Sequence, residues 1–186
     1  QEPLGYANLG LTYLRMARLS EAQVEVARAL ELEPAAPDVR LILAEIFLAQ
    51  DRTDDARATL EAALEADPQH VKTLYALASM DADIGDSAAA TRQASALGQV
   101  VELQPANVAA RVEQVSALLT SGDASAAAVA LEDLRQLVPE FPVEGQDLFD
   151  AALVAARAGD APGARGPALA FHNVMRTTPA YQQGLI

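Results

Sequence analysis

Residues 3–36 read PLGYANLGLTYLRMARLSEAQVEVARALELEPAA, and this stretch decides the fold. Small side chains at Gly10 and Ala22 allow two helices to cross closely within one hairpin. Larger side chains, such as Val26, fill the space around that crossing. Pro34 then ends the second helix, because proline cannot continue the helical hydrogen-bond ladder. The stretch therefore predicts a helix-turn-helix hairpin.

Prolines close similar stretches along the whole chain, at a spacing of roughly 34 residues, which is typical of repeated helical hairpins. These prolines are Pro34, Pro68, Pro105, Pro139 and Pro179. We therefore expect one domain of about five hairpins, at about residues 3–36, 37–70, 71–107, 108–141 and 142–180. The expected fold class is all-α, a right-handed α-solenoid.

The first hairpin resembles the tetratricopeptide repeat (TPR) family, whose pattern W-x2-L-G-x2-Y is followed by A, F, A and P. The matching residues are Tyr6, Leu9, Gly10, Tyr13, Ala22, Val26, Ala29 and Pro34. The second and fourth hairpins match the same pattern. The third has Asp81 where an aromatic residue is expected, so we expect a weak point there. The resemblance implies an array that binds protein or peptide partners.

The last hairpin departs from this pattern. Residues 144–158 and 168–177 are the expected helices, and residues 159–167 are expected to form a loop because of their glycine and proline content. An atypical terminal repeat is typical of a capping unit. Residues 171–182 are similar to the end of TPR arrays that precede FG-GAP-type propellers in exported bacterial proteins, and that likeness implies export.

Composition limits the partners of this chain. A net charge of −13 repels nucleic-acid phosphates and anionic lipid headgroups, so we expect no nucleic-acid partner. No apolar run approaches the ~20 residues that span a bilayer, so no direct membrane insertion is expected.

Alanine richness and a single lysine, Lys72, are typical of a GC-rich bacterial genome. Both ends resemble cuts from a longer protein, which favours a bacterial periplasmic or exported location and leaves the cytoplasm open.

The sequence predicts no catalytic site, no metal site and no cofactor. It contains no cysteine, and the only two histidines should lie far apart in an array of hairpins. His70 is expected to be a solvated turn residue, and His172 a surface or half-buried helix residue or a partner contact. The glycine-rich stretch near residues 159–166 lacks the G-K-[ST] of a phosphate loop. The acidic groups lack a calcium-loop pattern; they are Asp51, Asp54, Asp55, Asp81, Asp83 and Asp86.

The TPR resemblance also implies a concave groove lined by the first helix of each hairpin, where a ligand binds. The residues of this partner-binding groove that we expect to contact a ligand are Leu4, Leu11, Leu14, Arg15, Leu41, Glu45, Leu48, Lys72, Tyr75, Ser79 and Val112. The resemblance assigns further positions to the same groove: Ala7, Asp38, Ala49, Ala82, Asp83, Ala109, Ser116, Leu119 and Thr120. The N-terminal half is apolar, and such a surface is typically covered by a partner helix or peptide, or by the rest of its own chain. Simple exposure of the leucines is the third alternative. The carboxylate clamp of chaperone-binding relatives is not expected, because only Lys72 among its five corresponding positions carries the required group.

The sequence thus predicts a non-catalytic scaffold that binds a partner helix or peptide in an apolar concave groove. Two alternatives stay open. One is a structural subunit docked by its edges or ends in a larger membrane or envelope complex. The other is an appended module of an exported multidomain protein. The expected partners are a protein or peptide, or the other subunits of a multi-subunit assembly.

Overall fold

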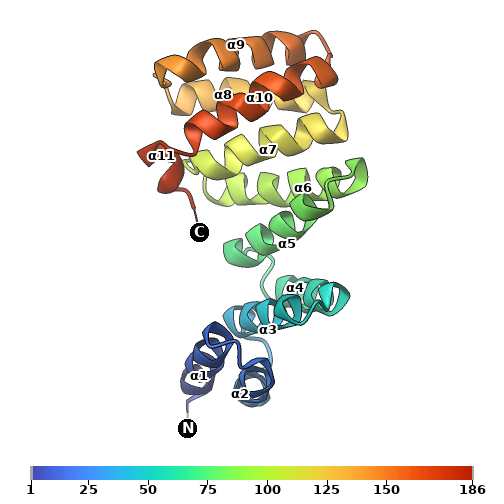
Figure 1. Ribbon diagram of the computed structural model, residues 1–186, viewed down its shortest axis with the longest axis vertical. Helices are drawn as coiled ribbons and strands as arrows, with labels where there is room; N and C mark the ends of the chain where they lie inside the picture. The colour runs from blue at the N-terminus through green and yellow to red at the C-terminus, as the bar shows by residue number, and fades with distance from the viewer. Residues whose placement is uncertain (1, 186) are drawn as a thin grey trace. The chain divides into compact units, whose positions relative to one another are not determined.

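The computed structural model describes residues 2–185, and every regular element in that range is an α-helix (Figure 1). The helices come in successive pairs, followed by one short helix. The pairs are α1 (Pro3–Arg15) with α2 (Leu19–Leu32), α3 (Pro37–Ala49) with α4 (Thr53–Ala66), α5 (Val71–Ile84) with α6 (Ser87–Leu103), α7 (Val108–Ser121) with α8 (Ala124–Leu137), and α9 (Val143–Arg157) with α10 (Ala161–Met175), before α11 (Pro179–Gln182). None of the helices between residues 2 and 185 is long and apolar enough to cross a membrane.

The chain folds as two compact units, Gln1–Leu77 (unit 1) and Ala78–Ile186 (unit 2), and the boundary falls within α5. Each unit is described here by itself. The expectation of one cooperative domain therefore stays a prediction, as does the right-handed sense of the solenoid.

Unit 1 depends on small residues where α1 crosses α2. Ala7, Ala22 and Ala29 are buried together with Val26. A Cβ atom added at Gly10 would lie 2.5 Å from the Val26 Cγ2 atom, so glycine is required at that close approach. The interpretation of Gly10 from sequence is confirmed.

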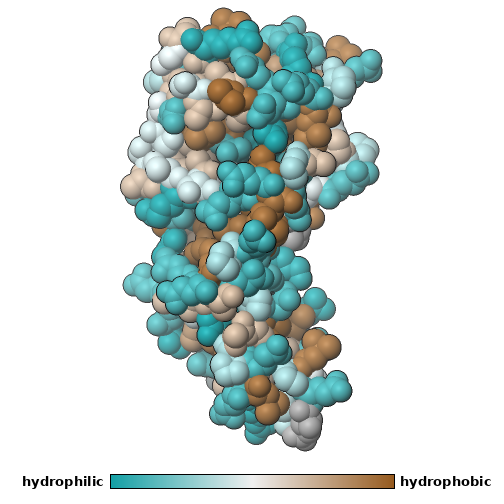
Figure 2. Space-filling view, turned by 180° about the vertical axis from the view of Figure 1, so that it is seen from behind, coloured by the Kyte–Doolittle hydropathy of each residue, from teal (hydrophilic) through white to brown (hydrophobic). Residues whose placement is uncertain are grey.

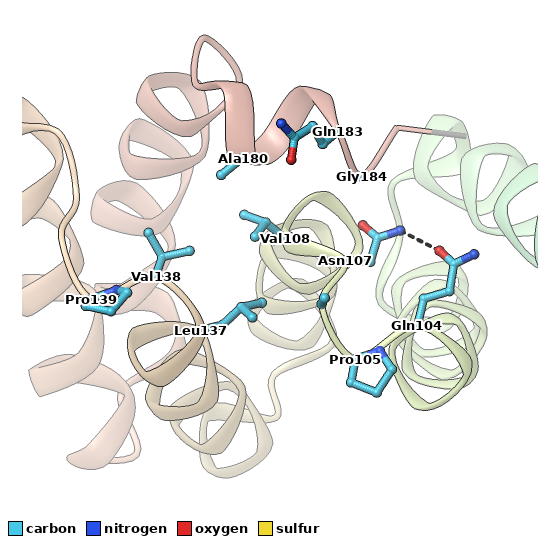
Figure 3. Close-up of a pocket in the computed structure, with 11 residues that line it drawn as sticks. Gln104, Pro105, Asn107, Val108, Leu137, Val138, Pro139, Ala180, Gln183 and Gly184 are labelled. Carbon is cyan, nitrogen blue, oxygen red and sulfur yellow. Dashed lines mark hydrogen bonds between the residues drawn. The ribbon is translucent and has the colours of Figure 1, made fainter.

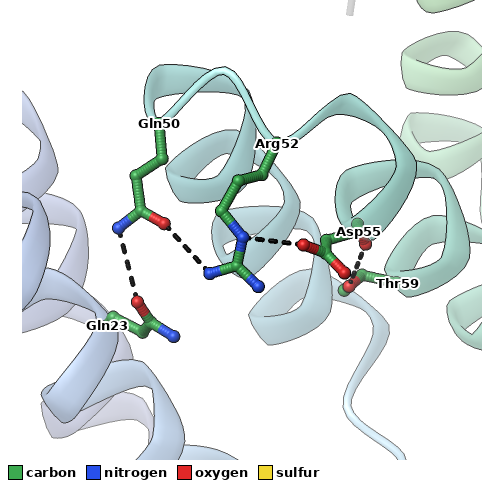
Figure 4. Close-up of polar contacts among 5 residues, drawn as sticks. All are labelled: Gln23, Gln50, Arg52, Asp55 and Thr59. Atoms are coloured by element: carbon green, nitrogen blue, oxygen red, sulfur yellow. Dashed lines mark hydrogen bonds and ion pairs between the residues drawn. The ribbon is translucent and has the colours of Figure 1, made fainter.

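Polar contacts around the second hairpin turn of unit 1 tie α2 to α3 and α4 (Figure 4). The Gln50 side chain donates to the Gln23 amide oxygen at 3.3 Å and accepts from Arg52 at 3.3 Å. Arg52 also donates to Asp55 at 2.7 Å, and its guanidinium lies 4.3 Å from the centre of the Phe47 ring. The turn is thus fixed by a cation–π contact and a salt bridge on one arginine.

Each hairpin turn places one residue in the left-handed region of φ, just after the first helix of the pair. These residues are Ala17, Asp51, Gly85, Gly122 and Gly159. In the last three hairpins the next residue is an aspartate that caps the second helix, with its carboxylate accepting from the backbone N–H three residues on. In unit 1 an arginine stands at that place, without a side-chain cap. Unit 2 therefore begins its second helices with caps that unit 1 lacks.

The prediction of a loop at residues 159–167 is wrong, because α10 begins at Ala161 and runs through Pro167. The Asp160 carboxylate accepts from the Gly163 N–H at 2.9 Å and so starts the helix. An interior proline costs about 3 kcal/mol of helix stability. Burying Phe171 and Met175 contributes about 1.5–3 kcal/mol each, and buried alanines on the same face add to this, so packing outweighs propensity.

Helix α10 packs against both α9 and α7, while α9 packs against α8. The core of this four-helix arrangement contains three of the four phenylalanines, Phe141, Phe149 and Phe171, with ring centroids 4.6 to 5.3 Å apart. In unit 1, by contrast, the first helices α1 and α3 contact one another directly. The last hairpin therefore closes over α7 rather than repeating the stacking of unit 1.

Asp81, expected to weaken the third hairpin, is 2% exposed and accepts from Arg92 Nε at 3.0 Å and Nη2 at 2.7 Å. Arg92 lies on α6, six residues after the Asp86 cap. Asp81, which occupies the position of the aromatic residue in the TPR pattern, therefore forms a salt bridge with Arg92 on the other helix of its hairpin. The lower stability of this hairpin stays a prediction.

Candidate partner-binding groove

A groove with a volume of about 650 Å³ runs between α1 and α3 in unit 1. Seven of the predicted groove residues line it: Leu4, Leu11, Leu14, Arg15, Leu41, Glu45 and Lys72. The first turn of α1 leaves Leu4 66% exposed. Hydrophobic residues reach the surface in separate patches among hydrophilic ones in the space-filling view (Figure 2). The groove therefore offers an apolar wall with charged residues beside it.

The charged residues of the groove fall into two sets. Lys72 donates to Asp38 Oδ1 at 3.0 Å, and His70 Nε2 lies 3.6 Å from the same oxygen. Glu45 has no hydrogen bond or ion pair within 4 Å among the described residues. Desolvation raises the pKa of Glu45, and the nearby positive charge of Arg15 offsets part of that shift. Glu45 is therefore the acid in this groove that lacks a close counter-ion.

The remaining predicted groove residues lie elsewhere. Leu48 is 39% exposed on α3 but does not line the groove, and Tyr75 and Ser79 follow along α5. Val112 is 2% exposed, so the prediction that it contacts a partner is wrong for the folded unit 2. The reason is that α10 packs on the helix that carries it.

Three groove residues were missed by the sequence analysis: Asn8, Val39 and Ile42. Each directly follows a position that the TPR pattern places in the groove. The groove wall on each helix therefore includes residues next to the predicted positions as well as those positions. Helices α1 and α3 lie against one another, and their facing flanks both reach the cavity. Widening the expected stripe by one neighbour would have found all three.

His70 is not the solvated turn residue that was predicted, because its side chain is only 14% exposed. Its Nδ1 atom lies 2.7 Å from the Thr73 hydroxyl. A hydroxyl, an imidazole and the Asp38 carboxylate thus stand in a row, as in a nucleophilic triad. Thr73 is fully buried, however, so its hydroxyl cannot reach a substrate. No group of three or more metal-binding side chains occurs between residues 2 and 185.

In unit 2, the face of α7 that corresponds to this groove is covered by the same chain. The residues of α7 at the groove positions are Ala109, Val112, Ser116, Leu119 and Thr120, and α10 and α11 pack against that helix. Ala109 and Leu119 are fully buried. Arg165 of α10 donates to the backbone oxygens of Leu119 at 2.8 Å and Thr120 at 2.9 Å. The cover of this face of α7 is thus a later segment of the same chain. Whether the rest of its own chain covers the groove of unit 1 stays a prediction.

A partly buried polar cluster holds α11 on α7. The Tyr181 hydroxyl donates to Glu113 at 2.8 Å and lies 2.9 Å from His172 Nε2. Desolvation raises the pKa of Glu113 and lowers the pKa of His172, while the neighbouring Arg176 lowers both. His172 is half-buried, as expected, and its contact is with its own chain.

A second cavity, of about 610 Å³, lies in unit 2 between the turn before α7, the end of α8 and the segment around α11 (Figure 3). The labelled side chains are mostly apolar, and Asn107 donates to Gln104 at 3.0 Å. Among residues 2–185, no acidic or basic side chain lines this cavity. It therefore lacks the charged groups that distinguish the groove of unit 1.

Residues 8–78 match the family model described as tetratricopeptide repeat. The match spans α1 to α4 and the start of α5, and so contains most of the groove between α1 and α3. No curated protein matches the chain.

Solved TPR structures show the same fold over nearly the whole chain. MamA of AMB-1 has a TM-score of 0.64 at 18% identity, covering 99% of this chain and 97% of its own. YrrB, described as a TPR protein with an unusual peptide-binding site, has a TM-score of 0.65 at 16% identity, covering 96% and 89%. The prediction of an all-α solenoid of TPR-like hairpins is confirmed. The likeness to arrays that precede propellers stays a prediction.

Proposed function

We propose that this chain is a protein-interaction scaffold that binds a partner helix or peptide in the groove between α1 and α3. Tetratricopeptide repeats are in general interaction modules without catalytic activity, and residues 8–78 carry such repeats. The observation that supports this site is the groove of about 650 Å³, with leucines on its wall and charged residues beside them. The corresponding face of α7 is already covered by α10.

The open shape and the chemistry of the groove suit a peptide. It is open along α1 and α3, and its apolar wall consists of leucine, isoleucine, valine and alanine side chains. Apolar anchors give affinity in such sites, and a few charged groups set register and specificity. The overall charge of −13 favours partners whose solvent face is basic, because long-range attraction raises their association rate.

The test is panning of a random peptide display library against the intact chain. Selected peptides are then measured on wild type, on Leu11→Glu in the groove and on Val24→Glu as a control. Val24 is a 51% exposed apolar residue of α2 that does not line the groove. Circular dichroism of each variant verifies that helicity is unchanged.

We expect Leu11→Glu to weaken the selected peptides at least tenfold, roughly 1.4 kcal/mol, and Val24→Glu to leave their dissociation constants unchanged. A carboxylate buried against an apolar anchor loses its hydration, which is the source of the loss. Equal binding to both variants would place the peptide site outside this groove and refute the proposal.

A further inference from the structure

In unit 2, the first helix of a hairpin, α7, is covered by a helix of the same chain, α10. Helix α10 presents Ala164 and Ala168 from its buried face, and the α7 residues Val112 and Leu119 are buried as well. Small residues on α10 permit a close helix-to-helix approach. The covering segment in this chain is therefore an α-helix whose buried face has small apolar residues as far as Ala168 and the larger Phe171 and Met175 after it.

An arginine accompanies this packing. Arg165 donates two hydrogen bonds to the last-turn carbonyls of α7, and it lines the same small cavity, of about 190 Å³, as Ser116 and Ala168. The guanidinium therefore lies beside the end of α7, where the helix dipole is negative. Ser116 itself donates only to the Val112 carbonyl, at 3.3 Å, among the described residues.

The same positions in unit 1 are not covered in this way. Counted from the turn prolines Pro105 and Pro34, Ser116 of α7 corresponds to Glu45 of α3. Glu45 has no hydrogen-bond or ion-pair partner within 4 Å in the described part of the chain, and Arg15 affects it only through a longer-range charge interaction. An arginine placed as Arg165 is placed in unit 2 would come close to Glu45 and to the end of α3.

We propose that the groove of unit 1 receives an α-helix that has a small apolar face and an arginine opposite Glu45, packed as α10 packs on α7. This inference rests on the proposed function, since it names the partner of the same groove. Two observations carry it: the own-chain helix on α7, and the acid without a close counter-ion at the matching place on α3. A pairing of this kind forms charge-assisted hydrogen bonds, which are stronger than neutral ones.

The probe is a synthetic peptide with the sequence of residues 160–176, carrying a fluorophore. A hydrocarbon staple joins two alkenyl amino acids that replace Pro162 and Gly166, which are exposed in unit 2 and one helical turn apart, and so holds the peptide helical. Fluorescence anisotropy gives its dissociation constant for the full chain. The variants are Glu45→Gln and Glu45→Arg, with Glu31→Gln on α2 as an exposed acid outside the groove.

We expect Glu45→Gln to weaken the stapled peptide roughly tenfold, and Glu45→Arg to weaken it further through like-charge repulsion. A peptide with Arg165→Glu should bind poorly to wild type and recover on the Glu45→Arg chain. Glu31→Gln should leave binding unchanged, which separates a local pair from general attraction to an acidic protein.

The outcomes distinguish the two proposals. If Leu11→Glu abolishes peptide binding while the charge at Glu45 has no effect, the helix-and-arginine inference is overturned and the groove remains the site. The inference is also overturned if library peptides bind through Leu11 while the stapled helix does not bind. If no peptide depends on Leu11, the proposed function itself fails.

Discussion

The hairpin turns allow a prediction from backbone conformation alone. Ala17 has a φ of 56°, in the same turn position where Gly122 has a φ of 96°. The left-handed conformation costs an L-residue roughly 1–2 kcal/mol, whereas glycine loses about 0.5–1 kcal/mol of extra entropy on folding. Ala17→Gly should therefore stabilise the first hairpin by about 0.5–1 kcal/mol. Asp51→Gly should gain less, because aspartate tolerates this conformation better.

Hydrogen exchange followed by mass spectrometry reports the first hairpin separately from the rest. A gain of about 0.5–1 kcal/mol slows exchange in α1 and α2 roughly two- to fivefold. The reverse substitution, Gly122→Ala, should speed exchange in α7 and α8, and strain is the cause because an added Cβ meets no atom within 4 Å. Faster exchange in the Ala17→Gly chain would refute the reasoning.

Two further predictions concern helix crossing and pH. Gly10→Ala should destabilise the fold by about 1–3 kcal/mol through overpacking against Val26. Gly5→Ala, in the first turn of α1, should stabilise it by about 0.5–1 kcal/mol, because an added Cβ there meets no atom within 4 Å. Melting temperatures of the two variants that move in the same direction would contradict this. Burial lowers the pKa of His172, so its contribution to stability is present above pH 6.5 and lost as the pH falls through the folded value. In the His172→Gln variant, the free energy of unfolding measured by urea denaturation should therefore fall less steeply as the pH drops below 6.5. Burial raises the pKa of Glu113, so its contribution has the opposite sign: it is present below pH 4.5 and lost as the pH rises through the folded value.

The helices of the array could be predicted because turn chemistry is local. Pro34 and its equivalents end helices by removing a backbone donor, wherever the helices pack. The start of α10 also had a local signal that was overlooked: Gly159-Asp160 repeats the Gly85-Asp86 and Gly122-Asp123 pairs that begin the preceding second helices. Glycine and proline content was the wrong guide there, because buried side chains later in the helix outweigh its weak propensity.

The groove could be predicted only in part, since its edges depend on tertiary packing. The leucines on α1 and α3 follow from the helical period. The burial of Val112 depends on where α10 packs, and nothing in the repeat pattern places α10 on α7 rather than in the position of a further stacked hairpin. The pairing of Asp81 with Arg92 joins the two helices of one hairpin, but the period does not specify which side chains of those helices face one another. These features require the three-dimensional structure.

The groove also contains the single lysine of the sequence, Lys72, whose side chain is 56% exposed beside Asp38. Among lysine side chains, amine-directed reagents therefore have one target, and it lies at the groove. A cross-linker attached there would tether whatever occupies the groove, and the length of its spacer would bound the distance to the captured residue. Acetylation at the same nitrogen would remove the positive charge that pairs with Asp38 and leave the groove more acidic. Lys72 can therefore be used both to attach a cross-linker at the groove and to change the charge of the groove.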